Sequence, residues 1–277
     1  MTSKGLEEAK RGLTIIVLLK QVPDIEKVRF DYVEGRLDRS SAEGVINPFD
    51  LNALEAAVQL REKIGGKVMV LSMGPPQAVE SLRDAIARGA DDAILLSDPA
   101  FAGADTLATS YTLASAIRKM GHFDLILCGE KTVDGDTAQV GPEVSEFLGI
   151  PCVAFVHEII DADVERVVVC SRLGKNDYKI EIRLPGLLTV TKDVNNPRMP
   201  TLKDKLRSRK AEVSIWGAED LVGFADERLF GTSGSPTRVM NVYAPSTEGR
   251  RCIMLEGTPE EKAGKIASIL RDLRIVR

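Results

Sequence analysis

The chain has 277 residues, of which 44% are hydrophobic and 28% charged, and its formal net charge is −4. This length is sufficient to bury a hydrophobic core and lies near the size at which one domain acquires appendages. The nearly balanced, slightly acidic composition does not suggest general attraction to nucleic acid or to an anionic membrane. The four cysteines are far apart and form no CxxC pair, which fits a reducing compartment, so we expect a cytoplasmic protein.

Residues 1–12 are polar and lack the apolar run of a signal peptide, which predicts a loose N-terminal tail. From residue 13 onward, short apolar runs alternate with stretches in which apolar residues recur at helical spacing. This alternation is typical of a parallel sheet covered by helices. The predicted strands span 13–20, 67–74, 92–97 and 123–130.

Helices are predicted between these strands. The first begins with Asn47 as N-cap and a proline in its first turn, and it ends before Gly65. The second covers 76–88, and the third begins at the predicted cap Asp105 and ends before Gly121. The chain therefore contains three consecutive strand–helix units.

The pattern changes after residue 151. Four strand-like runs follow one another closely without helices between them, which predicts antiparallel pairing at the edge of the sheet. We expect the α/β domain to span 13–200. Residues 201–277 include a basic stretch at 203–210 and a predicted final helix at 259–273, and we expect them to form an arm that packs on a partner subunit.

The strongest local signal for a ligand site is the segment 129–142, GEKTVDGDTAQVGP, which begins where a predicted strand ends and leads into a helix. In open parallel sheets ligands bind outside the carboxyl ends of strands, and free N–H groups at a helix start favour phosphate oxygens. We expect Gln139 and the backbone of Thr137 to Val140 to bind a diphosphate. A capped Asp/Gly turn is the purely structural alternative.

Two other strand ends carry residues of a similar kind. Asn47 can donate to and accept from a base or ribose, although a helix N-cap selects the same residue. Ser72 and Met73 end the second long strand, where a backbone edge can meet an adenine, although a simple turn is equally consistent. Together the three strand ends favour one shared site.

No GxGxxG motif follows the first strand, and no P-loop occurs in the sequence. His122 and His157 lie in or beside apolar runs and have no recognisable Ser-Asp or Cys partners, so we expect no catalytic residue. The four cysteines are dispersed and predict no metal site. Two other classes stay open: a stand-alone adenine-nucleotide module, and an ATP-pyrophosphatase, which needs an SGGxDS-like loop where this chain has KQVPD.

Four blocks, in order, resemble the beta subunits of electron transfer flavoproteins: KQVPD at 20–24, NPFDLNALEAAVQL at 47–60, the stretch 129–151, and LPGLLTVTKDVNNPRMPTL at 184–202. Ser145 departs from the family pattern, which has alanine there. The resemblance implies a doubly wound α/β fold of the adenine nucleotide alpha-hydrolase-like kind. It also implies pairing with an alpha subunit, whose FAD passes electrons to a partner such as an acyl-CoA dehydrogenase.

In ordinary members of that family the beta subunit holds AMP, whereas in electron-bifurcating members the same pocket holds a second FAD that takes a hydride from NADH. Small residues at the DGDTAQV positions resemble the bifurcating group, so we expect FAD, with AMP as the alternative. Only the bifurcating reading makes this electron-carrier subunit an NADH oxidant. The resemblance implies that the nucleotide contacts Lys20, Asn47, Ser72, Met73, Gly129, Asp134, Gly135, Asp136, Thr137, Ala138, Gln139 and Val140, with space for the flavin ring near Asp105, Thr106 and Thr109.

The resemblance also concerns partner binding. Leu202 matches a leucine that anchors partner dehydrogenases by entering an apolar pocket, and Lys203, Lys205 and Arg207 lie nearby to steer an acidic partner. Packing of Leu202 inside its own subunit is the alternative.

Overall fold

The computed structural model describes residues 12–24, 29–31, 36–38, 44–238, 240 and 253–276. Contacts divide the chain into two units, Met1–Arg238 and Val239–Arg277. Of the predicted N-terminal tail, all but Gly12 lies outside the described residues.

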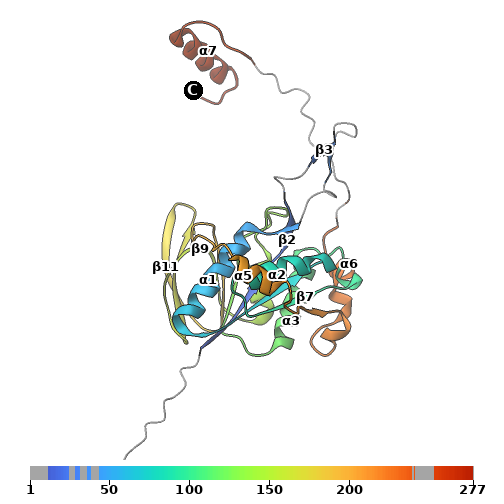
Figure 1. Cartoon of the computed structure of the whole chain (residues 1–277). Coiled ribbons are helices and arrows are strands. Elements are labelled where there is room, and N and C mark those ends of the chain that lie inside the picture. Colours follow the sequence, from blue (N-terminus) through green and yellow to red (C-terminus); the bar gives the residue numbers. More distant parts are fainter. Residues whose placement is uncertain are drawn as a thin grey trace, which may run out of the picture. The chain divides into compact units, whose positions relative to one another are not determined.

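The first unit is organised around a nine-stranded sheet in the order β11-β10-β9-β12-β8-β1-β6-β7-β13 (Figure 1). From β9 to β13 neighbouring strands are parallel, and β10 and β11 add an antiparallel edge. This confirms the predicted mostly parallel sheet. The strands are β1 Leu13–Leu18, β6 Gly66–Met73, β7 Asp92–Leu96, β8 Leu125–Gly129, β9 Cys152–Ala162, β10 Arg166–Leu173, β11 Asn176–Arg183, β12 Gly186–Val190 and β13 Ser214–Trp216.

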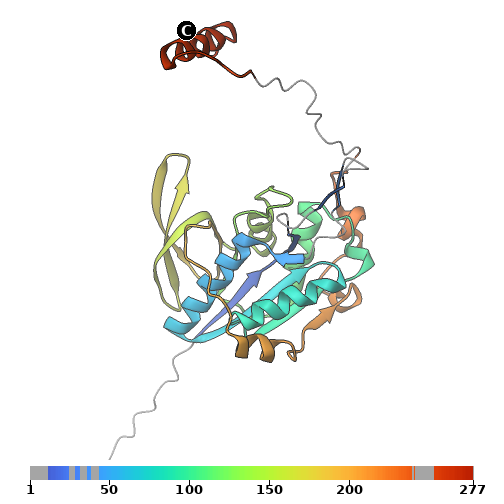
Figure 2. The same cartoon turned by 45° about the horizontal axis from the view of Figure 1, so that its top comes forward.

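Helices cover both faces of this sheet (Figures 1 and 2). On one face lie α1 (Pro48–Ile64) and α2 (Val79–Ala87), with α5 (Leu202–Ser208) against α2. On the other face lie α3 (Thr106–Met120) and α4 (Val140–Leu148). Residues of β1 alternate between the two resulting cores, as expected for a strand buried on both sides.

The burial of large apolar side chains holds these layers together. Leu54 of α1 and Leu82 of α2 are fully buried in one core, and Ile117 of α3 is fully buried in the other. Each such side chain contributes roughly 1.5–3 kcal/mol of transfer free energy.

One strand has different neighbours from those that its sequence pattern predicts. The run that forms β12 was grouped with the antiparallel edge strands, but it pairs in parallel with β8 and β9 inside the sheet. All five of its residues are buried, which requires cover on both faces and suits an interior strand.

The first unit extends beyond residue 200, the predicted end of the α/β domain. After β12, residues 191–213, which we call the connecting segment, lead to β13 at the opposite edge of the sheet. There Ser214, Ile215 and Trp216 pair with β7. The part of the expected arm up to Arg238 therefore belongs to the α/β unit.

Shorter elements complete the first unit. The stretch 231–239, which reads as a Gly- and Ser-rich loop, contains one helical turn, α6 (Gly231–Gly234), whose end is held by a hydrogen bond from Ser235 Oγ to the Gly231 carbonyl. The small two-stranded sheets and 3₁₀ turns are β2 Gln21–Pro23 with β5 Gly44–Ile46, β3 Arg29–Asp31 with β4 Arg36–Asp38, η2 Pro76–Ala78, η3 Pro99–Phe101, η4 Glu219–Leu221 and η5 Glu227–Leu229.

The second unit contains α7 (Pro259–Asp272), close to the predicted final helix. A capping box formed by Thr258 and Glu261 starts it, and none of its residues is buried. Across the described part of the chain, no helix has both the length and the apolarity needed to cross a membrane.

Candidate nucleotide site and docking surface

The strand order reverses at β1, because β6 lies on one side of it and β8 on the other. Such a switch point opens a crevice at the carboxyl ends of the strands, where ligands of doubly wound sheets bind. Lys20 follows β1, Ser72 and Met73 end β6, and Gly129 ends β8. The topology thus places all three predicted strand ends at one edge of the sheet.

Polar contacts join the residues after β1 and β8. Lys20 Nζ lies 2.7 Å from Asp134 Oδ2. Asn47, which is buried, donates from Nδ2 to the Lys131 carbonyl at 2.9 Å and accepts from the Val133 N–H at 3.2 Å. Asn47 makes no side-chain N-cap bond to α1. Its side chain instead fixes the loop that follows β8, which was not among the alternatives considered from sequence.

Asp50 is a central residue of this edge and was not among the predicted site residues. Its Oδ2 accepts from the Lys20 N–H at 2.8 Å and its Oδ1 from the Gly129 N–H at 3.0 Å, so it links the ends of β1 and β8. Burial raises its pKa to about 7, although hydrogen bonds from Lys20, Asn47 and Gly129 act to lower it. The available signal was a carboxylate on the buried stripe of a helix, four residues before Leu54.

The loop between β8 and α4 has an unusual backbone. Asp136 and Ala138 have φ values of 54° and 55°, a left-handed conformation that costs a non-glycine residue roughly 1–2 kcal/mol. The N–H groups of Thr137, Ala138, Gln139 and Val140 donate to no other described residue, and no side chain caps α4. Alternating left-handed residues and an uncapped helix start point several free donors outward, which suits an anion.

The starts of α3 and α4 are also joined. Thr106 Oγ1 donates to Gln139 Oε1 at 3.3 Å or to Glu143 Oε1 at 3.2 Å, and Ser110 Oγ donates to Glu143 Oε2 at 2.9 Å. Glu143 and Ser110 were not predicted as site residues. The predicted residues of α3 and the loop therefore meet.

Asp105 caps α3 through the Ala108 N–H, as predicted, and its other oxygen accepts from the N–H and hydroxyl of Thr237. Although desolvation opposes ionisation, these hydrogen bonds leave the pKa of Asp105 below its usual value. Asp105 is thereby occupied by protein contacts. Thr109 donates its N–H to the Asp105 carbonyl, and no hydrogen bond joins its side chain to another described residue.

Ser72 has a different environment. Its side chain is buried, and its hydroxyl oxygen has no hydrogen-bond partner among the described residues. Buried hydroxyls normally have a partner, so an unpaired one at a strand end is consistent with a missing ligand. Met73, the next residue, is half-buried.

The predicted docking residues lie on or beside α5, on the face that carries α1 and α2. Thr201 caps α5 through the Asp204 N–H, and Leu202 is its first residue, with 74% of its surface exposed. Packing inside the subunit therefore does not explain this leucine. Lys203, Lys205 and Arg207 form no ion pair with another described residue.

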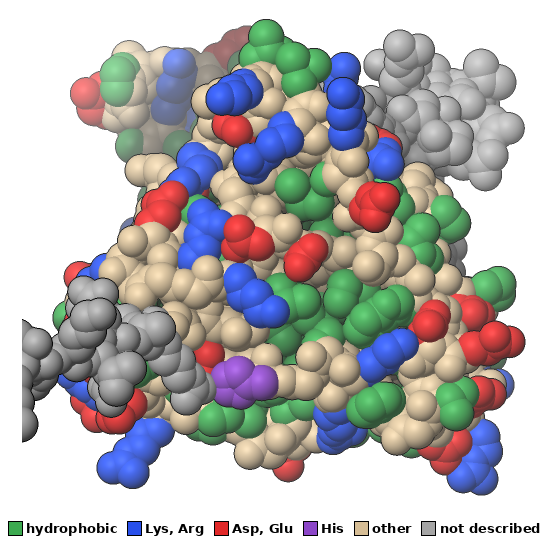
Figure 3. Space-filling model, turned by 60° about the horizontal axis from the view of Figure 1, so that its bottom comes forward, with side chains coloured by type: hydrophobic (Ala, Val, Ile, Leu, Met, Phe, Trp, Pro, Cys, Tyr) green, Lys and Arg blue, Asp and Glu red, His purple; other side chains and the backbone are tan. Residues whose placement is uncertain are grey.

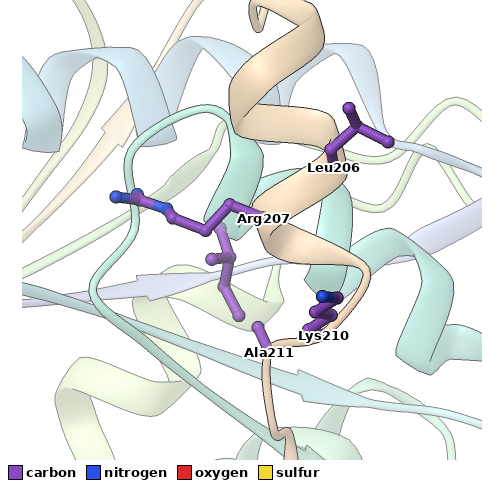
Figure 4. Close-up of a pocket in the computed structure, with 5 residues that line it drawn as sticks. Leu206, Arg207, Lys210 and Ala211 are labelled. Atoms are coloured by element: carbon purple, nitrogen blue, oxygen red, sulfur yellow. The ribbon is translucent and has the colours of Figure 1, made fainter.

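A hollow of about 720 Å³ lies beside α5 (Figure 4). It is lined by Ile86, Leu206, Arg207, Lys210 and Ala211. Apolar and cationic side chains from α2, from α5 and from the residues just after α5 therefore line the hollow together. The hollow is separate from the strand ends that carry the predicted nucleotide contacts.

The histidines lie elsewhere and have carboxylate neighbours: His122 Nε2 is 3.3 Å from Asp124, and His157 Nε2 is 3.3 Å from Asp177. On the face shown in Figure 3, basic and acidic side chains are interspersed with apolar ones. No single-sign patch of the kind that nucleic acid requires is visible on that face.

Comparison with known proteins decides the family. Residues 35–221 match the model of the electron transfer flavoprotein domain. An electron transfer flavoprotein subunit beta from Thermoanaerobacterium thermosaccharolyticum is 46% identical over 85% of this chain and 90% of its own length. The chain belongs to the electron transfer flavoprotein beta-subunit family. The fold and the recognition of this family from sequence are thereby confirmed.

Two further relatives of this beta subunit carry different names. "Caffeyl-CoA reductase-Etf complex subunit CarD" of Acetobacterium woodii is 41% identical over 95% of this chain and 100% of its own length. "Protein FixA" of Azorhizobium caulinodans is 43% identical over 87% of this chain and 88% of its own. Family membership makes this chain an electron-transfer subunit that pairs with an alpha subunit, and it implies binding of a flavin or related nucleotide.

Proposed function

We propose that this beta subunit binds FAD at the switch point, accepts electrons from NADH, and passes them through the alpha-subunit FAD to a flavin dehydrogenase such as an acyl-CoA dehydrogenase. In this bifurcating reading the chain contributes to NADH oxidation. The observation that carries the proposal is the loop 136–140, with its left-handed Asp136 and Ala138 and its free N–H groups.

The residues present fit a nucleotide with phosphates. The N–H groups of Thr137 to Val140 would hold the diphosphate, since they donate to no other described residue and lie at the positive end of α4. Small side chains at Gly135 and Ala138 leave the backbone accessible. The unpaired hydroxyl of Ser72 offers a polar contact at the next strand end.

Bound FAD would supply the chemistry, namely acceptance of a hydride from NADH. The protein would supply orientation and electrostatics. Lys20 contributes a cation beside the site, Asn47 and Asp50 fix the two strand ends, and Thr106 lies where α3 meets the loop.

Relatives support the assignment to this group. The chain matches the entire length of a subunit whose name places it in a reductase-Etf complex. The DGDTAQV residues also resemble those of the bifurcating members. AMP, which would use the same phosphate donors, is the alternative occupant and would make the protein a conventional electron shuttle.

The decisive experiment identifies the nucleotides released when the purified alpha–beta heterodimer is denatured. We expect two FAD per heterodimer and no AMP. One FAD with one AMP would contradict the bifurcating reading and assign the conventional function. Bleaching of the beta-subunit flavin by NADH, measured anaerobically by absorbance, tests the electron donor. Fractionation of the native cells tests the expected cytoplasmic location.

A further inference from the structure

Before it reaches α5, the connecting segment is attached to α1 by polar side chains. Asn52 Nδ2 donates to the carbonyls of Lys192 at 3.3 Å and Asn195 at 2.9 Å, and Asn195 Nδ2 donates back to the Asn52 carbonyl at 3.0 Å. Asn52 is buried. Because both partners are amides with fixed geometry, this exchange sets the position of the segment along α1.

Arg198 makes the strongest of these attachments. Its guanidinium bonds both oxygens of Glu55, at 2.8 and 3.1 Å, and both oxygens of Glu62, at 2.7 and 3.0 Å. Its N–H also donates to Glu55, and its carbonyl accepts from Arg88, the residue that follows α2. Paired, bidentate ion pairs with a buried carboxylate are stronger than ordinary surface pairs.

Electrostatics agree with this geometry. Burial opposes ionisation of Glu55, but hydrogen bonds from Arg198 and Gln59 outweigh it and leave the pKa of Glu55 below its usual value. The hydrogen bond from Arg198 also lowers the pKa of Glu62. Both carboxylates therefore remain charged partners of Arg198 at neutral pH.

Directly after this attachment come the two most exposed large apolar side chains described in the first unit. Met199 is 78% and Leu202 74% exposed. We call them the apolar ridge. A backbone held by several hydrogen bonds thus presents apolar side chains to solvent, the reverse of what stability alone favours, and such surfaces are typical of protein contacts.

Charge specifies the occupant of this surface. Five cations follow the ridge within eight residues, and none forms an ion pair with another described residue: Lys203, Lys205, Arg207, Arg209 and Lys210. The one acidic residue among them, Asp204, accepts from the Thr201 hydroxyl. A complementary partner has an apolar pocket with an acidic rim.

We propose that Arg198 is a positioning residue that preorganises the apolar ridge, Met199 and Leu202, for docking to a flavin dehydrogenase whose apolar pocket is rimmed by acidic side chains. This inference rests on the proposed role of the chain in delivering electrons to such a partner. Because Arg198 already holds the segment in place before contact, less conformational entropy is lost when the partner binds.

The test compares wild type, Arg198→Met and Arg198→Lys in the intact heterodimer. Arg166→Met is the matched control, because Arg166 of β10 also pairs with several acids and its side chain is about as exposed, at 38% against 35%. The probe is an acyl-CoA dehydrogenase that exchanges electrons with the wild-type heterodimer. Arg198→Met should raise the apparent KM for it about three- to tenfold, with kcat and nucleotide content unchanged.

Hydrogen–deuterium exchange of residues 194–202 should become faster in Arg198→Met, partly recover in Arg198→Lys, and stay at the wild-type rate in Arg166→Met. Combining Arg198→Met with Leu202→Ala should raise KM less than the two separate effects predict, because the first acts through the second. Faster exchange with an unchanged KM, strictly additive effects, or loss of nucleotide would each overturn the proposal. Release of AMP instead of FAD would contradict bifurcation while leaving this result intact.

Discussion

Gly129 and Asp50 meet where β8 ends. The Gly129 N–H donates to Asp50 Oδ1 at 3.0 Å, and a Cβ added to Gly129 would lie 2.6 Å from that same oxygen. It would also lie 2.5 Å from the Cβ of Phe49. The absence of a side chain at residue 129 therefore allows the start of α1 to lie against the strand end.

Gly129→Ala should push α1 away from β8, because the nearest atoms include the rigid start of the helix. We expect a loss of about 1–3 kcal/mol of stability, typical of overpacking, together with weaker retention of nucleotide. The midpoint of urea denaturation of the heterodimer measures the change in stability. Gly74→Ala at the end of β6 is the control, since its Cβ would contact only Ala78 at 3.4 Å. Equal midpoints for both variants would contradict this account.

The raised pKa of Asp50 predicts a pH dependence of stability. The folded protein holds the Asp50 proton up to about pH 7, whereas the unfolded aspartate titrates near 3.8. The proton is thus bound more tightly in the folded state, so the contribution of Asp50 is greatest below about pH 4 and declines as the pH rises to about 7.

Asp50→Asn removes this titration. The variant should therefore gain stability relative to wild type as the pH rises from about 4 to 7, with no further gain above that range. Denaturation midpoints at several pH values measure the difference. Asp92→Asn, at an exposed aspartate that begins β7, provides the comparison. A difference between Asp50→Asn and wild type that does not vary with pH would show that Asp50 stays ionised when buried.

Substitution of Ala138 tests whether the loop between β8 and α4 binds the phosphates of the nucleotide. Ala138→Asp adds a negative charge where we expect phosphate, so nucleotide affinity should fall at least about tenfold by charge repulsion. Ala138→Gly is the matched control, because glycine adopts the φ of 55° found there without strain. Nucleotide content after gel filtration is the measurement. Full retention in Ala138→Asp would mean that the pocket has been misplaced.

Substitution of Leu202 tests whether this leucine anchors the partner dehydrogenase. Leu202→Ala should cost about 1–3 kcal/mol of affinity for the partner dehydrogenase, as for an apolar hot spot, with folding and nucleotide content unchanged. Leu173→Ala, at an exposed leucine that ends β10, is the control. Charge reversal at Lys205 and Arg207 should slow association, and added salt should reduce that difference. An unaltered apparent KM in Leu202→Ala would rule out the anchor.

The exposed apolar side chains of the final helix, α7, indicate how the chain behaves when it is made without the alpha subunit. In α7 the apolar residues Ile266 and Ile269 are exposed, and a helix of 14 residues is only marginally stable by itself. We expect the chain to associate or precipitate without the alpha subunit and to become monodisperse on co-expression. Light scattering distinguishes these states. A stable monomer that fails to bind an alpha subunit would contradict the heterodimer.

The regular elements were predictable because each has a strong local pattern. Buried strands such as β1 and capped helices such as α3 follow directly from apolar periodicity and from capping residues such as Asp105. The parallel pairing of β12 was not predictable in this way, because a short apolar run does not specify its neighbours. The left-handed backbone conformation of Ala138 could not be predicted either, because alanine is not a residue that favours positive φ.

Only some of the site residues could be predicted from the sequence, and the reason is similar. Lys20, Asn47 and Asp134 were suggested by family blocks, and the structure brings them into one polar network. Asp50 and Glu143 were missed because their importance depends on partners distant in the chain. Asp50 accepts from Gly129, and Glu143 accepts from Ser110 of another helix.

The connecting segment 191–213 begins after β12 and returns to the sheet at β13, five strands away, or about 24 Å at ordinary strand spacing. It is attached at both ends by strands and on the way by α1 and α2. The segment therefore has the properties of an exchangeable cassette with a fixed span. Transplanted between family members together with Asn52, Glu55 and Glu62, it should carry partner preference with it.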